Sequence, residues 1–85
     1  MLSIRQIKAA RALLGWSQAD LAHHSSISEP TIARLESADG VLGGRANTAD
    51  RIRQSLEKAG IEFIYENGGG PGVRLRKSQR AKIQK

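Results

Sequence analysis

Apolar residues recur along the chain at intervals that predict four helices followed by two short strands. In the first segment Ile4, Ile7, Arg11 and Leu14 recur at three- and four-residue steps, which places them on one helical face. Ser3 can cap this helix, and Gly15 is a typical residue to end it. The pattern therefore predicts a first helix from about residue 3 to residue 14.

Two shorter helices joined by a tight turn are predicted between residues 17 and 37. Ser17 and Asp20 have the spacing of a capping box. After a polar break at residues 24–26, Ser28 can cap the next helix, and Pro30 falls in its first turn, where a missing N–H costs nothing. The apolar residues expected to face inward are Leu21, Ala22, Ile27, Ile32 and Leu35.

Glycine and polar residues predict a loop over residues 37–46, after which helical spacing returns. Asn47 or Thr48 can cap a fourth helix that runs to about Ala59, and Gly60 follows it. Its apolar face consists of Ile52, Leu56 and Ala59.

The last part of the body predicts a β-hairpin. Residues 61–66 are rich in strand-forming side chains, residues 67–72 form a glycine-rich turn, and residues 73–76 alternate apolar and basic. An isolated hairpin is marginally stable in water, so this one is expected to pack on the helices or to pair with a second copy. Pairing across a two-fold axis would produce a homodimer.

The segment from residue 11 to residue 36 resembles the helix-turn-helix of phage-repressor/Cro-like (Xre-family) regulators. The matching pieces are Arg11-Ala12-Leu13-Leu14-Gly15, Trp16-Ser17-Gln18-Ala19-Asp20-Leu21-Ala22, Ile27-Ser28 and Thr31-Ile32-Ala33-Arg34-Leu35-Glu36. The resemblance implies a mainly α, lambda-repressor-like helix-turn-helix bundle of four to five helices, to which this chain appends a C-terminal β-hairpin. We therefore expect a DNA-binding domain at 1–60, a hairpin and possible dimerisation element at 61–76, and a disordered basic tail at 77–85.

Family resemblance also implies which side chains meet DNA. Base contacts are expected from the third helix and phosphate contacts from the start of the second helix and the region before the fourth. The expected base contacts are Ser28, Glu29, Pro30, Thr31 and Arg34. The expected phosphate contacts are Ser17, Gln18, Arg45, Asn47 and Thr48.

Arg34 can fork onto guanine, Glu29 can accept from cytosine N4, and Pro30 can only touch a thymine methyl group. Family members usually carry Gln, Arg or Ser at the positions of Glu29 and Pro30, so this chain departs from the pattern there. Glu29 would repel phosphate unless it pairs with a base or with Arg34. The alternative is that Glu29 is an ordinary surface carboxylate. The family pattern further implies a structural ion pair between Arg11 and Glu36.

The charged residues are unevenly distributed along the chain. The net charge is +6, and residues 73–85 hold six basic residues and no acid, so residues 1–72 are formally neutral. A basic tail on a neutral body suits an electrostatic arm for phosphate, although a tail of this kind can also serve solubility alone.

Several other functions are disfavoured by the sequence. The chain has no cysteine, and the adjacent His23 and His24 lack neighbouring ligands, so we expect no metal and no cofactor. The glycine run at 68–72 lacks the Lys-Ser/Thr of a phosphate-binding loop, and no catalytic arrangement is visible, so we do not expect an enzyme. No apolar run is long enough for a membrane span or a signal peptide. Trp16 is expected to pack at a helix junction.

These observations favour a cytoplasmic, homodimeric transcriptional regulator that reads a palindromic operator in double-stranded DNA. One alternative is an antitoxin or anti-activator that binds a protein partner through the 61–76 hairpin. Another is a non-specific architectural or RNA-binding protein driven by the basic tail.

Overall fold

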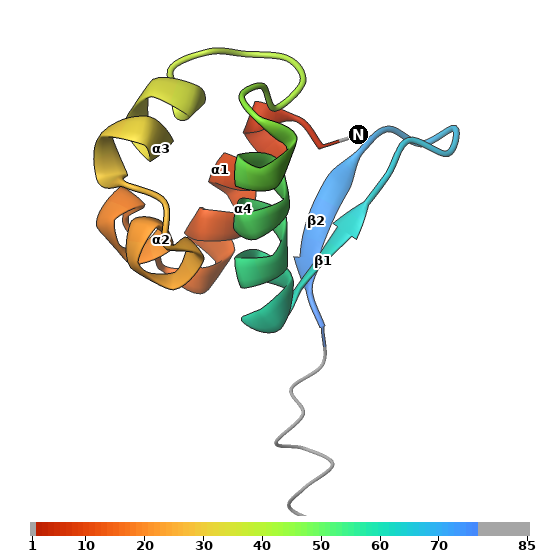
Figure 1. The fold of residues 1–85 in the computed structure, drawn as a ribbon. Helices are drawn as coiled ribbons and strands as arrows, with labels where there is room; N and C mark the ends of the chain where they lie inside the picture. The colour runs from red at the N-terminus through yellow and green to blue at the C-terminus, as the bar shows by residue number, and fades with distance from the viewer. Residues whose placement is uncertain (1, 77–85) are drawn as a thin grey trace, which may run out of the picture.

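The computed structural model describes residues 2–76, which form four helices and one two-stranded antiparallel sheet (Figure 1). The elements are α1 (Ile4–Leu14), α2 (Gln18–Ser25), α3 (Glu29–Glu36), α4 (Ala46–Lys58), β1 (Ile61–Ile64) and β2 (Gly72–Leu75). The predicted helical bundle with an appended hairpin is confirmed. The tail expected at 77–85 lies outside the described residues. Among the helices of residues 2–76, none has the length and apolar character needed to cross a membrane.

Local capping explains where the first three helices begin. The Ser3 hydroxyl accepts from the Gln6 backbone N–H at 3.1 Å, while the Gln6 side chain accepts from the Ser3 N–H at 2.9 Å. Ser17 and Asp20 form the predicted capping box at α2, and Ser28 caps α3. Gly15, with φ 70°, adopts the left-handed conformation that ends α1.

The start of α4 differs from the prediction. Arg45, not Asn47 or Thr48, occupies the N-cap position, and its side chain makes no capping hydrogen bond. Helical geometry begins at Ala46, a strong helix former, so Asn47 and Thr48 lie inside the first turn. The expected polar break at 24–26 is also shorter than predicted, because Ser25 belongs to α2 and its hydroxyl donates to the Leu21 carbonyl oxygen at 2.7 Å.

The α3–α4 loop contains no fifth helix in the described structure. Instead it passes beside the start of the chain, where Val41 forms a β-bridge with Ser3. Backbone hydrogen bonds join Ile4 N–H to Gly40 O and Leu42 N–H to Leu2 O, each at 2.8 Å. These long-range contacts fix the path of the loop and hence the point at which α4 begins.

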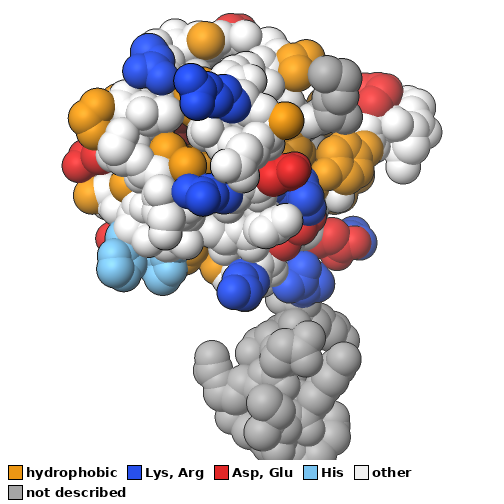
Figure 2. Space-filling model, viewed as in Figure 1, with side chains coloured by type: hydrophobic (Ala, Val, Ile, Leu, Met, Phe, Trp, Pro, Cys, Tyr) orange, Lys and Arg blue, Asp and Glu red, His pale blue; other side chains and the backbone are white. Residues whose placement is uncertain are grey.

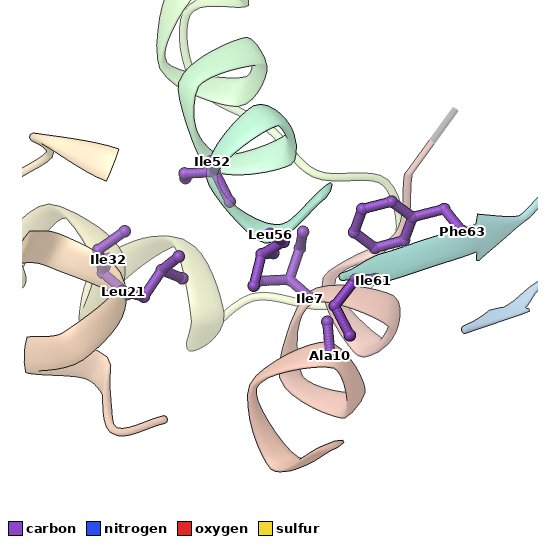
Figure 3. Close-up of a cluster of buried hydrophobic side chains, with 8 residues drawn as sticks. All are labelled: Ile7, Ala10, Leu21, Ile32, Ile52, Leu56, Ile61 and Phe63. Atoms are coloured by element: carbon purple, nitrogen blue, oxygen red, sulfur yellow. The ribbon is translucent and has the colours of Figure 1, made fainter. Parts of the chain in front are cut away.

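The core is a single cluster in which α4 lies between the helix-turn-helix and the hairpin (Figures 1 and 3). Ile52 and Leu56 of α4 are buried between Leu21 and Ile32 on one side and Ile7 on the other (Figure 3). Burial of each such side chain contributes about 1.5–3 kcal/mol to stability. The remaining buried members of the cluster are Ala10, Ile61 and Phe63. Ile27 and Leu35 are only partly buried against it.

The hairpin is shorter than expected and packs on α1 and α4. The first strand ends at Ile64 rather than at residue 66, and the second covers Gly72–Leu75, with Phe63 opposite Val73. Buried Gln6 donates its amide to the carbonyl oxygens of Ile64, at 3.1 Å, and Gly72, at 3.0 Å. At the other end Arg76 donates to Ile61 O at 3.1 Å and to Glu57 O at 2.7 Å. The hairpin is therefore attached to the bundle at both of its ends.

Candidate nucleic-acid interface

Helix α3 is buried along one side and exposed along the other. Ile32 and Glu36 are 1% and 4% exposed, whereas Glu29, Pro30 and Arg34 are open to solvent. Pro30 and Arg34 lie opposite Ile32 and Glu36 on a helix with 3.6 residues per turn, so the inward residues fix which side chains α3 presents. Glu29 is exposed because it is the first residue of the helix. The exposed side is the one expected to face DNA.

Ser28 and Thr31, both expected base contacts, are engaged with each other at the start of α3. The Ser28 hydroxyl donates to Thr31 Oγ1 at 2.9 Å and accepts from the Thr31 backbone N–H at 3.4 Å. Since the single Ser28 proton is used in this way, the Thr31 hydroxyl proton is the one free to reach a ligand. Ser28 thus acts first as a helix cap.

The C-terminal end of α3 is held to α1 by Arg11. Its Nε and Nη2 donate to the two Glu36 carboxylate oxygens at 2.8 and 2.7 Å, and its Nη1 donates to the Trp16 carbonyl oxygen at 2.9 Å. Burial would raise the pKa of Glu36, but the hydrogen bonds from Arg11 and Gln18 outweigh it and hold that pKa below its ordinary value. Hydrogen bonding to Glu36 likewise raises the pKa of Arg11. The ion pair is therefore fully charged at neutral pH.

Gln18 lies at the first position of α2 and contacts the same carboxylate. Its Nε2 donates to Glu36 Oε1 at 3.0 Å, and the residue is partly buried rather than free in solvent. A primary amide has two N–H groups, so one stays available for a phosphate oxygen. The structure thus fixes the orientation of the side chain expected to touch the DNA backbone.

Next to Gln18, Ser17 and Asp20 define what the start of α2 offers to an anion. The Asp20 carboxylate accepts from the Ser17 N–H at 2.9 Å, and the Ser17 hydroxyl accepts from the Asp20 N–H at 3.0 Å. This hydrogen bond from the Ser17 backbone is the main reason that the pKa of Asp20 is lowered. The Ser17 hydroxyl keeps its own proton for donation.

A hollow of about 310 Å³ between α3 and α4 brings residues from both expected groups together. We call it the α3–α4 hollow, and it is lined by Thr31, Arg34, Leu35, Gly44, Arg45 and Thr48. Gly44 has φ 83°, and a Cβ there would lie 3.3 Å from Leu35, so glycine suits the close approach of the loop to α3. No carboxylate lines the hollow. Asn47 is exposed on the first turn of α4 but does not line it.

Glu29 differs from the other exposed residues of α3 because it is acidic. Within residues 2–76 it forms no ion pair, and the pairing with Arg34 considered from the sequence is not made. A carboxylate at the start of α3 is favourable to the helix dipole. It repels phosphate and so favours the cytosine amino group among DNA ligands.

Two side chains near α2 have a packing role. The ring of Trp16 packs partly against the core and stacks on His24, with centroids 4.2 Å apart and planes 5° from parallel. His23 meets His24 edge to face. In the described part of the chain, no group of three potential metal ligands comes together.

Two exposed cations of α4, Arg51 and Lys58, were not among the expected contacts. They are seven residues apart and therefore lie on one side of the helix, next to the face that carries Thr48. This spacing is the only signal in the sequence that could have linked them.

Comparison with known proteins agrees with this geometry. Residues 7–42 match the family model described as Helix-turn-helix, a span that contains α1 from Ile7 onward, α2, α3 and most of the following loop. No match was found among curated proteins. Residues 7–42 are thus similar to the helix-turn-helix of Xre, lambda-repressor-like proteins, a family of DNA-binding regulators.

Proposed function

We propose that the chain is a transcriptional regulator that reads a specific sequence in double-stranded DNA by placing the exposed side of α3 in the major groove. The observation that carries this proposal is the α3–α4 hollow. There Arg34, on the reading helix, and Arg45, just before α4, share one acid-free surface. A groove-reading helix flanked by cations matches the way such domains divide base and phosphate contacts.

In this proposal Glu29, Pro30, Thr31 and Arg34 face base edges, with Ser28 close to them as the cap of α3. Gln18 and Ser17 contact one DNA strand at the start of α2. Arg45, Asn47 and Thr48 contact the backbone on the other side of the groove. The Arg11–Glu36 pair holds the two ends of this surface in register and touches no DNA.

We also propose that the working form is a homodimer, with the hairpin as the dimerisation element. Each strand of the two-stranded sheet has one edge without a strand partner in the described chain. Two-fold pairing of such edges would place two α3 helices on half-sites about 34 Å apart along a palindromic operator. The regulator acts where the DNA is, so we place it in the cytoplasm.

The basic residues at the end of the chain complete the proposal. Lys77, Arg80, Lys82 and Lys85 carry four positive charges and no acid accompanies them in that segment. We assign them to non-specific attraction between protein and DNA, which raises the rate of encounter.

The test is selection of binding sequences from a random duplex library, followed by titration of the selected duplex against its scrambled version at physiological salt. We expect a palindromic sequence bound at least about 10³-fold more tightly than the scramble. Equal, salt-sensitive binding to both duplexes, lost on removal of residues 77–85, would support the architectural alternative. Absence of DNA binding would direct attention to a protein partner at the hairpin.

A further inference from the structure

We propose that α4 carries a second phosphate-binding surface, centred on Arg51 and Lys58, that contacts the DNA backbone outside the segment read by α3. The proposal rests on the proposed DNA-binding function and adds a site to it. It concerns a side of α4 that neither the family match nor the expected contacts include, since the match ends at residue 42.

A hollow of about 340 Å³ between the end of α2 and α4 forms this surface. We call it the α2–α4 hollow. Five of the lining side chains have polar groups that make no hydrogen bond within their own helix. They are His24, Ser26, Arg51, Gln54 and Lys58. All five are exposed. The hydroxyls of Ser25 and Ser55, by contrast, donate to carbonyl oxygens of their own helices.

The charges of α4 are sorted onto two sides of the helix. On one side Arg53 pairs with Asp50 at 3.5 Å and with Glu57 at 2.8 Å, so its charge is neutralised. On the next side Arg51 and Lys58 line the α2–α4 hollow with no carboxylate among the lining residues. Within residues 2–76 neither of them forms an ion pair. Glu57, which lines a neighbouring hollow together with Lys58, is held by Arg53 at 2.8 Å. The two unpaired cations and the hydrogen-bond donors beside them therefore attract an anion.

The same sorting holds across the molecule. The exposed arginines Arg5 and Arg74 are paired with Asp39 and Glu62, whereas Arg34 and Arg45 of the α3–α4 hollow form no ion pair in the described chain. Lys8 and Arg76 are also exposed and form no ion pair among the described residues, but they line neither hollow. The two acid-free hollows follow one another along α4, because Thr48 lines the first and Arg51, one turn later, lines the second. Figure 2 shows Lys and Arg side chains spaced down the face over α4, with Asp and Glu side chains beside them toward the hairpin.

Helix geometry gives the length of DNA that this surface can follow. The rise from Thr48 to Lys58 along α4 is about 15 Å. At 3.4 Å per base pair, this corresponds to about four base pairs of backbone beyond the contacts of the first hollow. The partner is therefore the phosphate backbone that flanks each half-site. These contacts depend on its charge and not on the base sequence.

The test compares Arg51→Gln/Lys58→Gln with the wild type on two duplexes that share the selected sequence, one with six flanking base pairs on each side and one trimmed to the core. Arg53→Gln is the matched control, since it removes a paired cation from the same helix. Each lost phosphate contact lowers the slope of log Kd against log salt by about 0.9. The double variant loses two contacts. The ratio of wild-type affinity to variant affinity should therefore fall about tenfold when the salt is raised from 50 to 200 mM.

We expect this loss on the flanked duplex only, with the trimmed duplex and the Arg53→Gln control behaving as wild type. Equal slopes and affinities for wild type and double variant on the flanked duplex would overturn the proposal. A wild type that prefers the selected sequence but is insensitive to the double substitution refutes this inference and leaves the proposed function intact. A wild type without sequence preference refutes the proposed function instead.

A second measurement does not depend on folding of the variant. Wild-type protein is titrated with the flanked duplex in which methylphosphonates replace the flanking phosphates. The proposal requires the same reduction in salt slope as the double substitution produces. An unchanged slope shows that the flanking charge is not contacted, and an acidic protein surface would then be the remaining partner for the α2–α4 hollow.

Discussion

Gln18 donates its side-chain amide to Glu36, so a residue expected to touch DNA is oriented by a residue that holds the fold together. The two atoms, Nε2 and Oε1, are 3.0 Å apart. Arg11 holds the same carboxylate through two further hydrogen bonds. One buried carboxylate therefore sets the relative position of α1, the start of α2 and the end of α3.

Replacing Gln18 with alanine is expected to weaken binding to every DNA sequence alike. The substitution removes one phosphate hydrogen bond, worth about 1 kcal/mol or about fivefold in Kd, and leaves all base contacts in place. Glu36 keeps Arg11, so the melting temperature should change little. The measurement is titration of the selected and the scrambled duplex. An unchanged affinity for both would refute the phosphate role, and a loss confined to the selected duplex would assign Gln18 to base reading.

Removing one partner of the Arg11–Glu36 pair should cost far more stability than removing both. Arg11→Met leaves an uncompensated carboxylate that is 4% exposed, at a cost of about 3 kcal/mol. The double variant Arg11→Met/Glu36→Leu replaces the pair by apolar side chains and should recover most of that loss. Urea unfolding of the three proteins measures the difference. Equal destabilisation by the single and double variants would mean that the ion pair stabilises the fold more than apolar side chains do at the same two positions.

The stability of the domain is expected to fall in acid through Glu36. Its pKa is lower in the folded protein than the ordinary value of 4.5, so the unfolded chain binds the proton more readily. The contribution of Glu36 is therefore complete above pH 4.5 and is lost as the pH falls from there through the lower pKa of the folded state. Unfolding free energies of the wild type and of Arg11→Met/Glu36→Leu are measured between pH 6 and about pH 3, and the wild type should lose stability relative to the double variant toward the acid end. Parallel pH profiles would show that other carboxylates dominate.

Much of the fold could be predicted because its signals are local. The caps at Ser3, Ser17 and Ser28 depend on residues three positions away, and the structure places all three as expected. The start of α4 could not be predicted in this way. Its position depends on a loop path fixed by the bridge between Ser3 and Val41, which are distant in sequence.

The same limit applies to the candidate site. The family pattern led to the pairing of Arg11 with Glu36, but it gave no indication that Gln18 would join them. Gln6 shows the limit most clearly. Its spacing from Ser3 is that of a capping box, yet its amide also binds two carbonyl oxygens of the hairpin, 58 and 66 residues further along the chain. Only the folded arrangement reveals such contacts, because they depend on how the hairpin packs and not on any local pattern.

Arg34→Ala is expected to reduce sequence specificity while leaving non-specific affinity nearly unchanged. Arg34 is exposed on α3 and forms no ion pair within residues 2–76, so the change should not disturb the fold. Loss of a forked contact to guanine costs about 1–3 kcal/mol at one base pair. The measurement is the ratio of Kd values for scrambled and selected duplexes. Arg5→Ala is the control, since it removes an exposed arginine that is paired with Asp39 and lines neither hollow. A uniform loss on both duplexes would make Arg34 a phosphate contact.

Gln6→Leu should loosen the hairpin and, with it, the proposed dimer. The leucine preserves the buried volume but leaves the carbonyl oxygens of Ile64 and Gly72 without their donor, at a cost of about 1–3 kcal/mol. Arg74→Ala is the matched control within the hairpin. It breaks only an exposed pair with Glu62, which contributes little to stability because solvent screens it. Sedimentation equilibrium over a range of concentrations should show a dimer dissociation constant at least about tenfold higher for Gln6→Leu, and little change for the control. If Gln6→Leu lowers the unfolding free energy but leaves dimerisation unchanged, the two copies associate through another surface.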